Sequence, residues 1–479
     1  MNAPIKLVNA AAAIDDGDQG LYEVRKKIYP RAVHGKFAVA RWATVLVTQL
    51  VFYGVPWLSW NGRQAVLFDL AARKFYIFGL VFWPQDIVYL TVLLIVCAYS
   101  LFLFTAVAGR LWCGYACPQT VYTEIFMWIE RVVEGERLAR MKLDKGSLSG
   151  RKLALKIAKH ALWIALSLWT GFTFVGYFTP ILTLGQEVLS LQTGPWETFW
   201  VLFYGFATYG NAGWLREQVC KYMCPYARFQ SVMFDSDTLI VTYDRERGEQ
   251  RGSRGRNVDY KAKGLGDCVD CGICVQVCPT GIDIRNGLQY ECIGCAACID
   301  GCDQVMEKVG YPKGLIRYST ENALKGHYNT DRIVKRVLRP RVLIYTAILW
   351  LIIVAAAVTL YQRVPLKVDV IRDRGNVMHD ADEREIQNVY RLQIMNTQEI
   401  ARDVRVAVAG LDGIELEGSA QAIHMAPASS RVVPVRVEAP RASGKPGSNR
   451  IQFTIEAVDP AHPEAAPIRV IEPATFVIP

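Results

Sequence analysis

The sequence predicts a multidomain integral membrane protein, with an α-helical membrane domain, a cysteine-rich domain inserted before its last span and an all-β domain at the C-terminus. Three observations lead to this prediction. Five long apolar runs contain no charged residue, two cysteine runs repeat one spacing, and the hydrophobic period changes to two residues after position 365. The 479 residues are 52% hydrophobic and 21% charged, which suits this class of protein.

The five apolar runs have the length of membrane spans. At about 1.5 Å per residue, each can cross, or nearly cross, a hydrocarbon core of about 30 Å. The predicted spans are residues 42–60, 87–107, 161–178, 198–214 and 342–361. The fourth is the shortest and the most polar of them. A buried helix of a soluble protein is the alternative for a single run, but five such runs in one chain favour a lipid bilayer.

Lysine and arginine counts predict the orientation. Residues 1–41 carry seven basic residues and residues 108–160 carry ten, whereas residues 61–86 carry three and residues 179–197 none. Because basic loops stay in the cytoplasm, we expect the N-terminus and the cysteine-rich domain inside and the C-terminal domain outside. The formal net charge of +9 then lies along membrane flanks, which suits lipid headgroups rather than nucleic acid.

These spans divide the chain into five parts. The predicted parts are a cytoplasmic N-terminal segment (1–41), a membrane domain with four spans (42–243), a cytoplasmic cysteine-rich domain (244–341), the fifth span (342–361) and an outer β-domain (362–479). The outer loop within the membrane domain, residues 61–86, is too apolar for a plain linker. We expect its aromatic residues to lie among the lipid headgroups. They are Phe75, Tyr76, Phe78, Phe82 and Trp83.

Eight of the thirteen cysteines fall within residues 268–302. The first run reads C-x2-C-x2-C-x3-C-P, and the second repeats this spacing with Asp303 in place of the proline. Four thiolates in this order wrap a cubane 4Fe–4S cluster. Zinc is the alternative, but a zinc site uses two separated CxxC pairs, and disulfides give no reason for the repeat. The sequence therefore predicts a two-cluster, ferredoxin-like domain.

The predicted ligands cross between the runs, because in two-cluster ferredoxins the fourth cysteine of each run binds the other cluster. One cluster is assigned to Cys268, Cys271, Cys274 and Cys302, and the other to Cys292, Cys295, Cys298 and Cys278. Small residues between these cysteines let backbone N–H groups approach the sulfurs. The extra negative charge of Asp303 should lower the potential of a nearby cluster.

Residues from 365 onward have the pattern of short strands. Segments such as VYRLQIM, VRVAVAG and IQFTIEAV alternate or are rich in β-branched residues, with turn residues between them. This pattern predicts a β-sandwich of the immunoglobulin type. Copper binding by its histidines and methionines is an alternative use, although such residues usually belong to the surface and the core. They are Met378, His379, Met395, His424 and Met425.

Four further cysteines form two pairs with the spacing C-x3-C-P. The segment GRLWCGYACPQT follows the second span, and LREQVCKYMCPYARF follows the fourth, which indicates a duplicated helical hairpin. On a helix, thiols four residues apart share one face, and the proline would end or kink that turn. Soft thiolates suit Cu(I), iron–sulfur or zinc, while packing between helices is the structural alternative. The candidate site consists of Cys113, Cys117, Cys220 and Cys224.

On these motifs the sequence resembles the FixG/CcoG family of cytochrome c oxidase accessory proteins. The resemblance covers essentially the whole chain, including the FYIFG and WPxD loop, both C-x3-C-P pairs, CVDCGICVQVCPTGIDIR and LQYECIGCAACID. It implies a bacterial inner-membrane iron–sulfur protein, with a periplasmic C-terminal domain, that helps to assemble cbb3-type oxidase. It also implies reduction of Cu(II) to Cu(I) for the oxidase, with copper as substrate or transient ligand at the paired cysteines.

The physics of the clusters agrees with that implication, since ferredoxin-type clusters can lie near −400 mV and deliver single electrons. Two other classes of function stay open. The paired cysteines also resemble those of membrane polyferredoxins in quinol oxidation, which would make the chain a non-catalytic electron-transfer subunit, and an assembly scaffold is the third. The expected partners are the lipid bilayer, oxidase assembly factors or a copper chaperone or transporter, and a cytoplasmic electron donor. A homodimer is left open.

Overall fold

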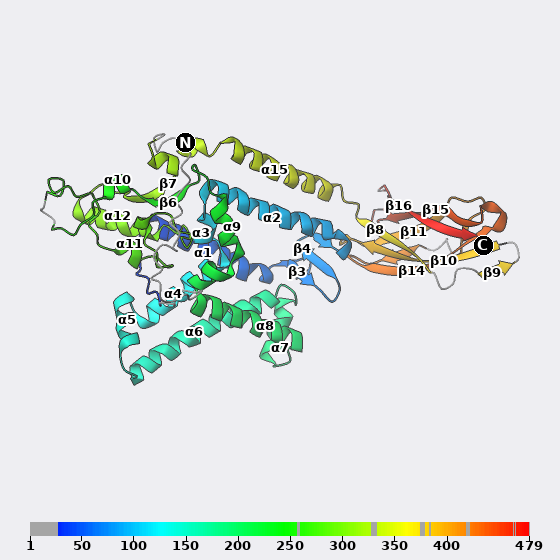
Figure 1. Ribbon diagram of the computed structural model, residues 1–479. Coiled ribbons are helices and arrows are strands. Elements are labelled where there is room, and N and C mark those ends of the chain that lie inside the picture. Colours follow the sequence, from blue (N-terminus) through cyan, green and yellow to red (C-terminus); the bar gives the residue numbers. More distant parts are fainter. Residues whose placement is uncertain are drawn as a thin grey trace, which may run out of the picture. The chain divides into compact units, whose positions relative to one another are not determined.

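The computed structural model describes residues 27–255, 259–326, 333–373, 379–382, 385–417, 422–462, 464 and 466–478 (Figure 1). The chain divides into two compact units. The first comprises Met1–Trp57 and Val92–Ile353, and the second comprises Leu58–Thr91 and Val354–Pro479. All thirteen cysteines belong to the first unit.

Among the described residues, three helices are long and apolar enough to cross a membrane. They are Lys36–Trp57, which contains α1 (Lys36–Gly54), Pro84–Ala108, which contains α2 (Ile87–Ala108), and Pro340–Tyr361, which is α15. At most 17% of the most apolar window of each is buried inside the protein. Helices that are apolar on all sides and so little covered by protein need lipid around them, so the chain is a membrane protein.

The third and fourth expected spans fall on α6 (Gly150–Val175) and α8 (Pro195–Thr208), with α7 (Ile181–Leu189) between them. α6 and α8 lie side by side (Figure 1), and a Cβ on Gly171 would come within 3.0 Å of Gly205 N. Close contact at small residues is typical of helices packed in a membrane. Neither helix joins the three above by length and hydropathy over the described ranges, so the total of five spans stays a prediction.

An amphipathic stretch follows α2 in the chain. Its helices are α3 (Leu111–Tyr115), α4 (Pro118–Glu134) and α5 (Arg137–Lys145). Phe126 of α4 stacks on Trp163 of α6 with ring centroids 5.2 Å apart, and Ala212 completes this apolar cluster. Ala212 belongs to the π-helix η4 (Tyr209–Leu215), which continues α8. The contact therefore joins three elements of the first unit.

A buried ionic network joins the same elements. The carboxylate of Glu130 accepts hydrogen bonds from Arg216 at 3.0 Å and from Arg140 at 3.2 Å, while Glu134 pairs with Lys159 at 3.0 Å. The side chains of both glutamates are almost fully buried. Burial by itself would raise the pKa of Glu130, but Arg216, Arg140 and Lys159 hold it below its usual value. A buried charge is tolerated only with its partners in place, so the network fixes α4 against α6 and η4.

The cysteine-rich domain surrounds a small antiparallel strand pair, β6 (Ile240–Tyr243) with β7 (Ile316–Ser319). Figure 1 shows this pair together with α11 (Ile273–Gln276) and α12 (Ala297–Val309). The remaining helices are α9 (Pro225–Met233), α10 (Arg245–Gly248), the 3-10 turn η6 (Ile284–Asn286), α13 (Glu321–Leu324) and α14 (Ile333–Arg336). The apolar core includes Ile284, Ile299, Met306 and Leu315, so the cysteines are embedded in a small packed domain.

The second unit contains the predicted β-sandwich (Figure 1). One sheet has the order β12 (Glu415–Leu416), β14 (Ser430–Pro440), β10 (Glu385–Asn396) and β8 (Leu366–Arg372), with β9 (His379–Asp382) also paired to β10. The other has the order β13 (Ile423–Met425), β11 (Arg402–Ala409), β15 (Gly447–Val458) and β16 (Ile468–Ile478). Tyr390, Leu392, Phe453 and Phe476 meet in one core between the sheets, which confirms the C-terminal immunoglobulin-like domain.

Residues 59–82, most of them in the loop that was expected to lie outside the membrane, also fold into strands of the second unit. They are β1 (Ser59–Trp60), β2 (Arg63–Gln64), β3 (Val66–Asp69), β4 (Lys74–Ile77) and β5 (Leu80–Phe82). Val81 and Trp83 are buried against Met395 and Ala428 of the β-domain. The expectation that Trp83 lies among lipid headgroups is therefore wrong, because protein covers its ring. Its aromatic neighbour Phe78 is 43% exposed.

We expect Glu130→Gln to lower the free energy of unfolding by about 3–5 kcal/mol, because Arg140 and Arg216 would stay buried without their shared counter-charge. Thermal unfolding in detergent measures the change, with the exposed Glu136→Gln as the matched control. Since the folded pKa of Glu130 is depressed, its contribution is complete above the unfolded carboxyl pKa of about 4.3. It is lost as the pH falls through the lower folded value, so the difference from wild type should shrink in acid. An equal loss in both variants would contradict the prediction.

Candidate metal centres

The two cysteine runs share a backbone conformation at matching positions. Asp270 and Gly272 flank the second cysteine of the first run, with φ of 53° and 64°, and Gly294 and Ala296 flank that of the second, with φ of 69° and 58°. A left-handed backbone costs a non-glycine residue roughly 1–2 kcal/mol. Asp270 and Ala296 therefore hold it only because each loop must bend sharply around its second cysteine. The repeat in spacing is a repeat in structure.

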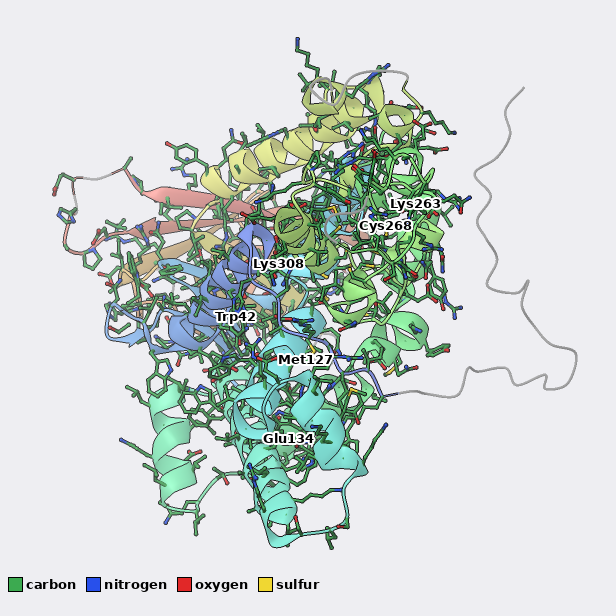
Figure 2. The ribbon with its side chains drawn as sticks, turned by 90° about the vertical axis from the view of Figure 1, so that its left-hand side faces the viewer. Trp42, Met127, Glu134, Lys263, Cys268 and Lys308 are labelled. Atoms are coloured by element: carbon green, nitrogen blue, oxygen red, sulfur yellow. The ribbon has the colours of Figure 1, made fainter. Side chains whose placement is uncertain are left out.

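Each set of four cysteines lines a cavity of its own. The first cavity, with about 310 Å³ of empty space, is lined by Cys268, Cys271, Cys274 and Cys302. The second, with about 350 Å³, is lined by Cys278, Cys292, Cys295 and Cys298, and Cys274 also borders it. In both cavities the fourth cysteine of one run joins three of the other. Figure 2 labels Cys268 in the first of these groups.

Each cavity is lined by the four cysteines that one 4Fe–4S cluster needs, one thiolate for each iron. Three of the four come from one run, at the spacing that wraps such a cluster, and the fourth comes from the other run. The residues present therefore fit a 4Fe–4S cluster in each cavity. Among the described residues, no three His, Cys, Asp or Glu side chains are already arranged around a single metal ion, either here or at the other cysteines.

Burial makes these cysteines weak acids in the absence of metal. It raises the pKa of Cys292 and of Cys302 to about 12, although the Gly294 backbone N–H opposes the effect at Cys292. Ligation needs thiolates, so cluster assembly must release protons. Of the eight cysteines in the two runs, all of them described, only Cys271 is exposed. The most exposed of the eight thiols thus belongs to the first site, whose other three cysteines are buried.

The structure also brings the two C-x3-C-P pairs together. Cys113 lies in α3 and Cys117 precedes α4, while Cys220 lies in the π-helix η5 (Val219–Met223) and Cys224 precedes α9. Burial, and then the charges of the other three, raise the pKa of Cys220 to about 12. The hydrogen bond from the Sγ of Cys113 to Gln230 of α9, the helix that Cys224 caps, also joins the two pairs. Cys113, Cys117, Cys220 and Cys224 are called the thiol quartet below.

The prolines of these pairs begin helices instead of ending them. Cys117 and Cys224 are the N-caps of α4 and α9, with ψ of 128° and 109°, and Pro118 and Pro225 take the first helical position. Proline suits that position because it lacks the N–H group that would be unpaired there. The expectation that each pair shares one continuous helix is therefore wrong, since a helix ends between the two cysteines.

α3 packs directly against the second cysteine run. A Cβ on Gly114 would lie 2.8 Å from backbone atoms of Cys295, and a Cβ on Gly294 would lie 3.1 Å from Arg110 O. Neither contact leaves room for a side chain. Cys113 is therefore adjacent in sequence to a residue that touches the loop of the second run.

A cavity between these elements reaches both sites. Cys220 and Cys295 line it together, and so do Trp42 and Met127, which Figure 2 labels. Two carboxylates, Glu124 and Glu217, also belong to its lining. A small solute in this cavity would be near the thiol quartet and the second run at once.

Two polar residues near the C-x3-C-P pairs gain a role from the packing, Arg110 and Gln230. The Sγ of Cys113 donates to Oε1 of the buried Gln230 at 3.3 Å, and Arg110 donates to the backbone carbonyls of Tyr290 and Ala227. The sequence marks Arg110 only as the arginine that leads the repeat, a few residues before the first cysteine of its pair. Gln230 has no such signal, and the packing alone reveals it.

The histidines and methionines of the β-domain give no comparable grouping in the described part. Met395 and Met425 are buried in apolar packing, and His424 Nδ1 lies 2.8 Å from Asp403. Met378 lies outside the described residues, as does the side chain of His379. Cys97 is exposed on α2 and does not belong to the quartet.

Comparison with known families identifies the parts of the chain. Residues 215–321 match a 4Fe–4S dicluster domain, and residues 356–479 match the Ig-like fold at the C-terminus of FixG, described as an oxidoreductase. Residues 90–135, which include Cys113 and Cys117, match a 4Fe–4S binding domain. A crystal structure of a FixG-related protein from Vibrio parahaemolyticus is 23% identical, with a TM-score of 0.20, and covers 24% of this chain and 95% of that chain.

Two relatives extend over nearly the whole chain. The nitrogen fixation protein FixG of Rhizobium meliloti is 35% identical over 96% of this chain and 94% of its own length. The protein RdxA of Cereibacter sphaeroides is 37% identical over 95% of this chain and 98% of its own length. With these similarities and the domain matches above, the chain belongs to the FixG/RdxA family of membrane-bound iron–sulfur electron-transfer proteins.

Proposed function

We propose that this protein reduces Cu(II) to Cu(I) at the thiol quartet, as part of the assembly of cbb3-type cytochrome oxidase in a bacterial inner membrane. The observation that supports the proposal most is the contact between the two candidate redox sites. Gly114, next to Cys113, lies against the backbone of Cys295 with no space for a side chain. Electrons held near the second cysteine run would therefore be close to a metal bound by the quartet.

The cysteine sites suggest an order for electron transfer. When bound, the two clusters would supply one-electron transfer, held by the ligand sets assigned above. Cys271 offers the exposed end of this relay to a donor protein, while α3 packs against Cys295 of the second site. Reduction of Cu(II) to Cu(I) takes one electron and no proton, so the stoichiometry fits a one-electron relay.

The quartet has the chemistry to retain the product. Thiolates are soft ligands that favour Cu(I) over harder cations. Because burial raises the pKa of Cys113 to about 11, its thiol holds a proton at neutral pH until a metal displaces it. Gln230 accepts from that thiol and orients the sulfur towards the rest of the site.

A second candidate function is an electron-transfer subunit that passes electrons to a partner and binds no copper. Residues 90–135 match a 4Fe–4S binding domain, and this match favours the second function. Besides Cys97, the cysteines of that segment are Cys113 and Cys117, half of the quartet, which would then be cluster ligands. In this case the quartet would hold a third iron–sulfur cluster. Metal analysis distinguishes the two functions.

We expect about eight iron and eight acid-labile sulfide per chain after anaerobic purification, because two complete cysteine runs each hold four of both. The quartet should then take up one further equivalent of Cu(I). Twelve iron atoms per chain, with no uptake of copper, would favour the electron-transfer subunit. Stoichiometric zinc without sulfide would refute both functions.

We expect the paired change Cys113→Ser with Cys117→Ser to reduce Cu(I) binding and cupric reduction to background, because serine keeps the size but is a poor ligand for Cu(I). The absorbance of the clusters should remain. Cys97→Ser, a cysteine outside the quartet, is the matched control and should behave as wild type. Cys271→Ser should do the reverse, by damaging a cluster and stopping reduction while Cu(I) supplied directly still binds. Normal reduction by the paired variant would place the copper site elsewhere.

We also propose five spans, with the N-terminus and cluster domain in the cytoplasm and the β-domain in the periplasm. A reporter inserted after Gln192, between α7 and α8, should then be active only on the periplasmic side. The same reporter after Ser149, before α6, should be active only in the cytoplasm. Cytoplasmic activity at both positions would mean that α6 and α8 do not span.

A further inference from the structure

Arg110 is a buried cation without a carboxylate partner among the described residues. Arg110 is 7% exposed. Its guanidinium donates instead to the backbone carbonyls of Tyr290 and Ala227, and at 3.5 Å to that of Cys292. Carbonyls satisfy the hydrogen bonds of a guanidinium but do not neutralise it, and an unpaired buried charge is unfavourable.

Arg110 lies between cysteines of both redox sites. It is the N-cap of α3, which holds Cys113 of the thiol quartet, and its guanidinium lies 3.5 Å from the carbonyl oxygen of Cys292 in the second run. It also donates to Ala227 of α9, the helix that begins after Cys224. The positive charge of Arg110 is therefore near both sites.

A second arginine nearby provides a contrast. Arg41 of α1 is equally buried and donates to the backbone carbonyl of Cys295 at 2.6 Å. Its charge acts on Cys295 of the second run. Arg41 lies on α1, which holds no cysteine, whereas Arg110 is the N-cap of α3, which holds Cys113. Of the quartet, Arg41 shares a cavity with Cys220. The chain thus offers one cation attached to both sites and one attached to the second run.

We propose that Arg110 is a positioning residue whose charge is the shared counter-charge of the second cluster and the thiol quartet. The part of this inference that concerns copper at the quartet rests on the proposed function, and the part that concerns the cluster does not. Reduction of a cluster adds one negative charge, and binding of Cu(I) by two thiolates leaves one in excess. A fixed cation in a low-dielectric site stabilises both of these states, so it raises the potential of the cluster and the affinity for Cu(I) together.

The hydrogen bonds of Arg110 separate this role from a merely structural one. Its planar fork ties the loop at Tyr290 to α9 at Ala227, and lysine cannot reproduce that fork although it keeps the charge. Glutamine keeps a donor amide but removes the charge. Arg110→Lys and Arg110→Gln therefore test the fork and the charge separately.

The experiment is a redox titration of the purified holoprotein without copper, followed by EPR, combined with competition for Cu(I) against a chelator. In Arg110→Gln we expect one of the two cluster waves to shift to lower potential by the equivalent of a tenfold change in equilibrium constant, which is 59 mV for one electron. The other wave is the internal reference. Cu(I) binding should weaken about tenfold, and Arg110→Lys should leave both values near wild type.

Arg41→Gln is the matched control, and it should shift the same wave without weakening Cu(I) binding. Equal shifts in Arg110→Lys and Arg110→Gln, or no shift in either, would overturn the proposal. If Arg110→Gln loses iron, Arg110→Lys decides the question. A full iron content and an unshifted wave in Arg110→Lys support the role of the charge, whereas iron loss in both variants assigns Arg110 a structural role. If wild type binds no Cu(I), the proposed function fails, while the shift of the cluster wave still decides whether Arg110 is the counter-charge of the cluster.

Discussion

Backbone touches backbone where α3 meets the loop of the second cysteine run, and the arrangement of the cysteine sites depends on this contact. Gly114 and Gly294 face the opposite chain from the two sides, so neither position tolerates a Cβ. A bulkier residue at either would push the thiol quartet away from the second cluster site. Arg110, one turn before Gly114, donates to Tyr290 and Ala227 across the same contact. The glycines allow the approach and the arginine holds it.

The other half of the quartet depends on charge buried near the membrane. Cys220 follows the π-helix η4, and Arg216 at the end of that helix is held by Glu130 of α4 at 3.0 Å. Trp163 of α6 donates through Nε1 to Phe126 O at 3.1 Å, which fixes the same helices from the apolar side. The quartet comes from two hairpins, so the positions of its sulfurs depend on how firmly these helices are held together. An ionic network that is costly to break is therefore well placed here.

Composition and spacing predicted three of the membrane helices, the β-sandwich and the 4Fe–4S character of the cysteine-rich domain, because each leaves a periodic signal in the chain. The positions of Pro118 and Pro225 were misread, since a C-x3-C spacing fits one helix as well as a helix end followed by a new helix. Trp83 was assigned to lipid because an aromatic ring in an apolar loop can be covered by lipid or by a protein surface. Gln230 carries no sequence signal, and Arg110 carries only that of the arginine that leads each C-x3-C-P pair. Their roles come from contacts between segments that are more than a hundred residues apart.

The first membrane helix is bound to the cluster domain at the second site. Gly35 at the N-cap of α1 has no side chain to satisfy the first N–H groups of that helix. Asp300 of α12 takes this part, accepting from Ala38 N at 2.7 Å and from Phe37 N at 3.3 Å, and its charge suits the positive end of the helix dipole. Asp300 lies between Cys298 of the second site and Cys302 of the first, and Arg41 of α1 donates to the carbonyl of Cys295 at 2.6 Å. The start of a membrane helix is therefore fixed to the loop of the second run, while Cys271 of the first site stays exposed. In the proposed relay, electrons would enter near Cys271 and leave towards Cys113, which follows the membrane helix α2 in the chain.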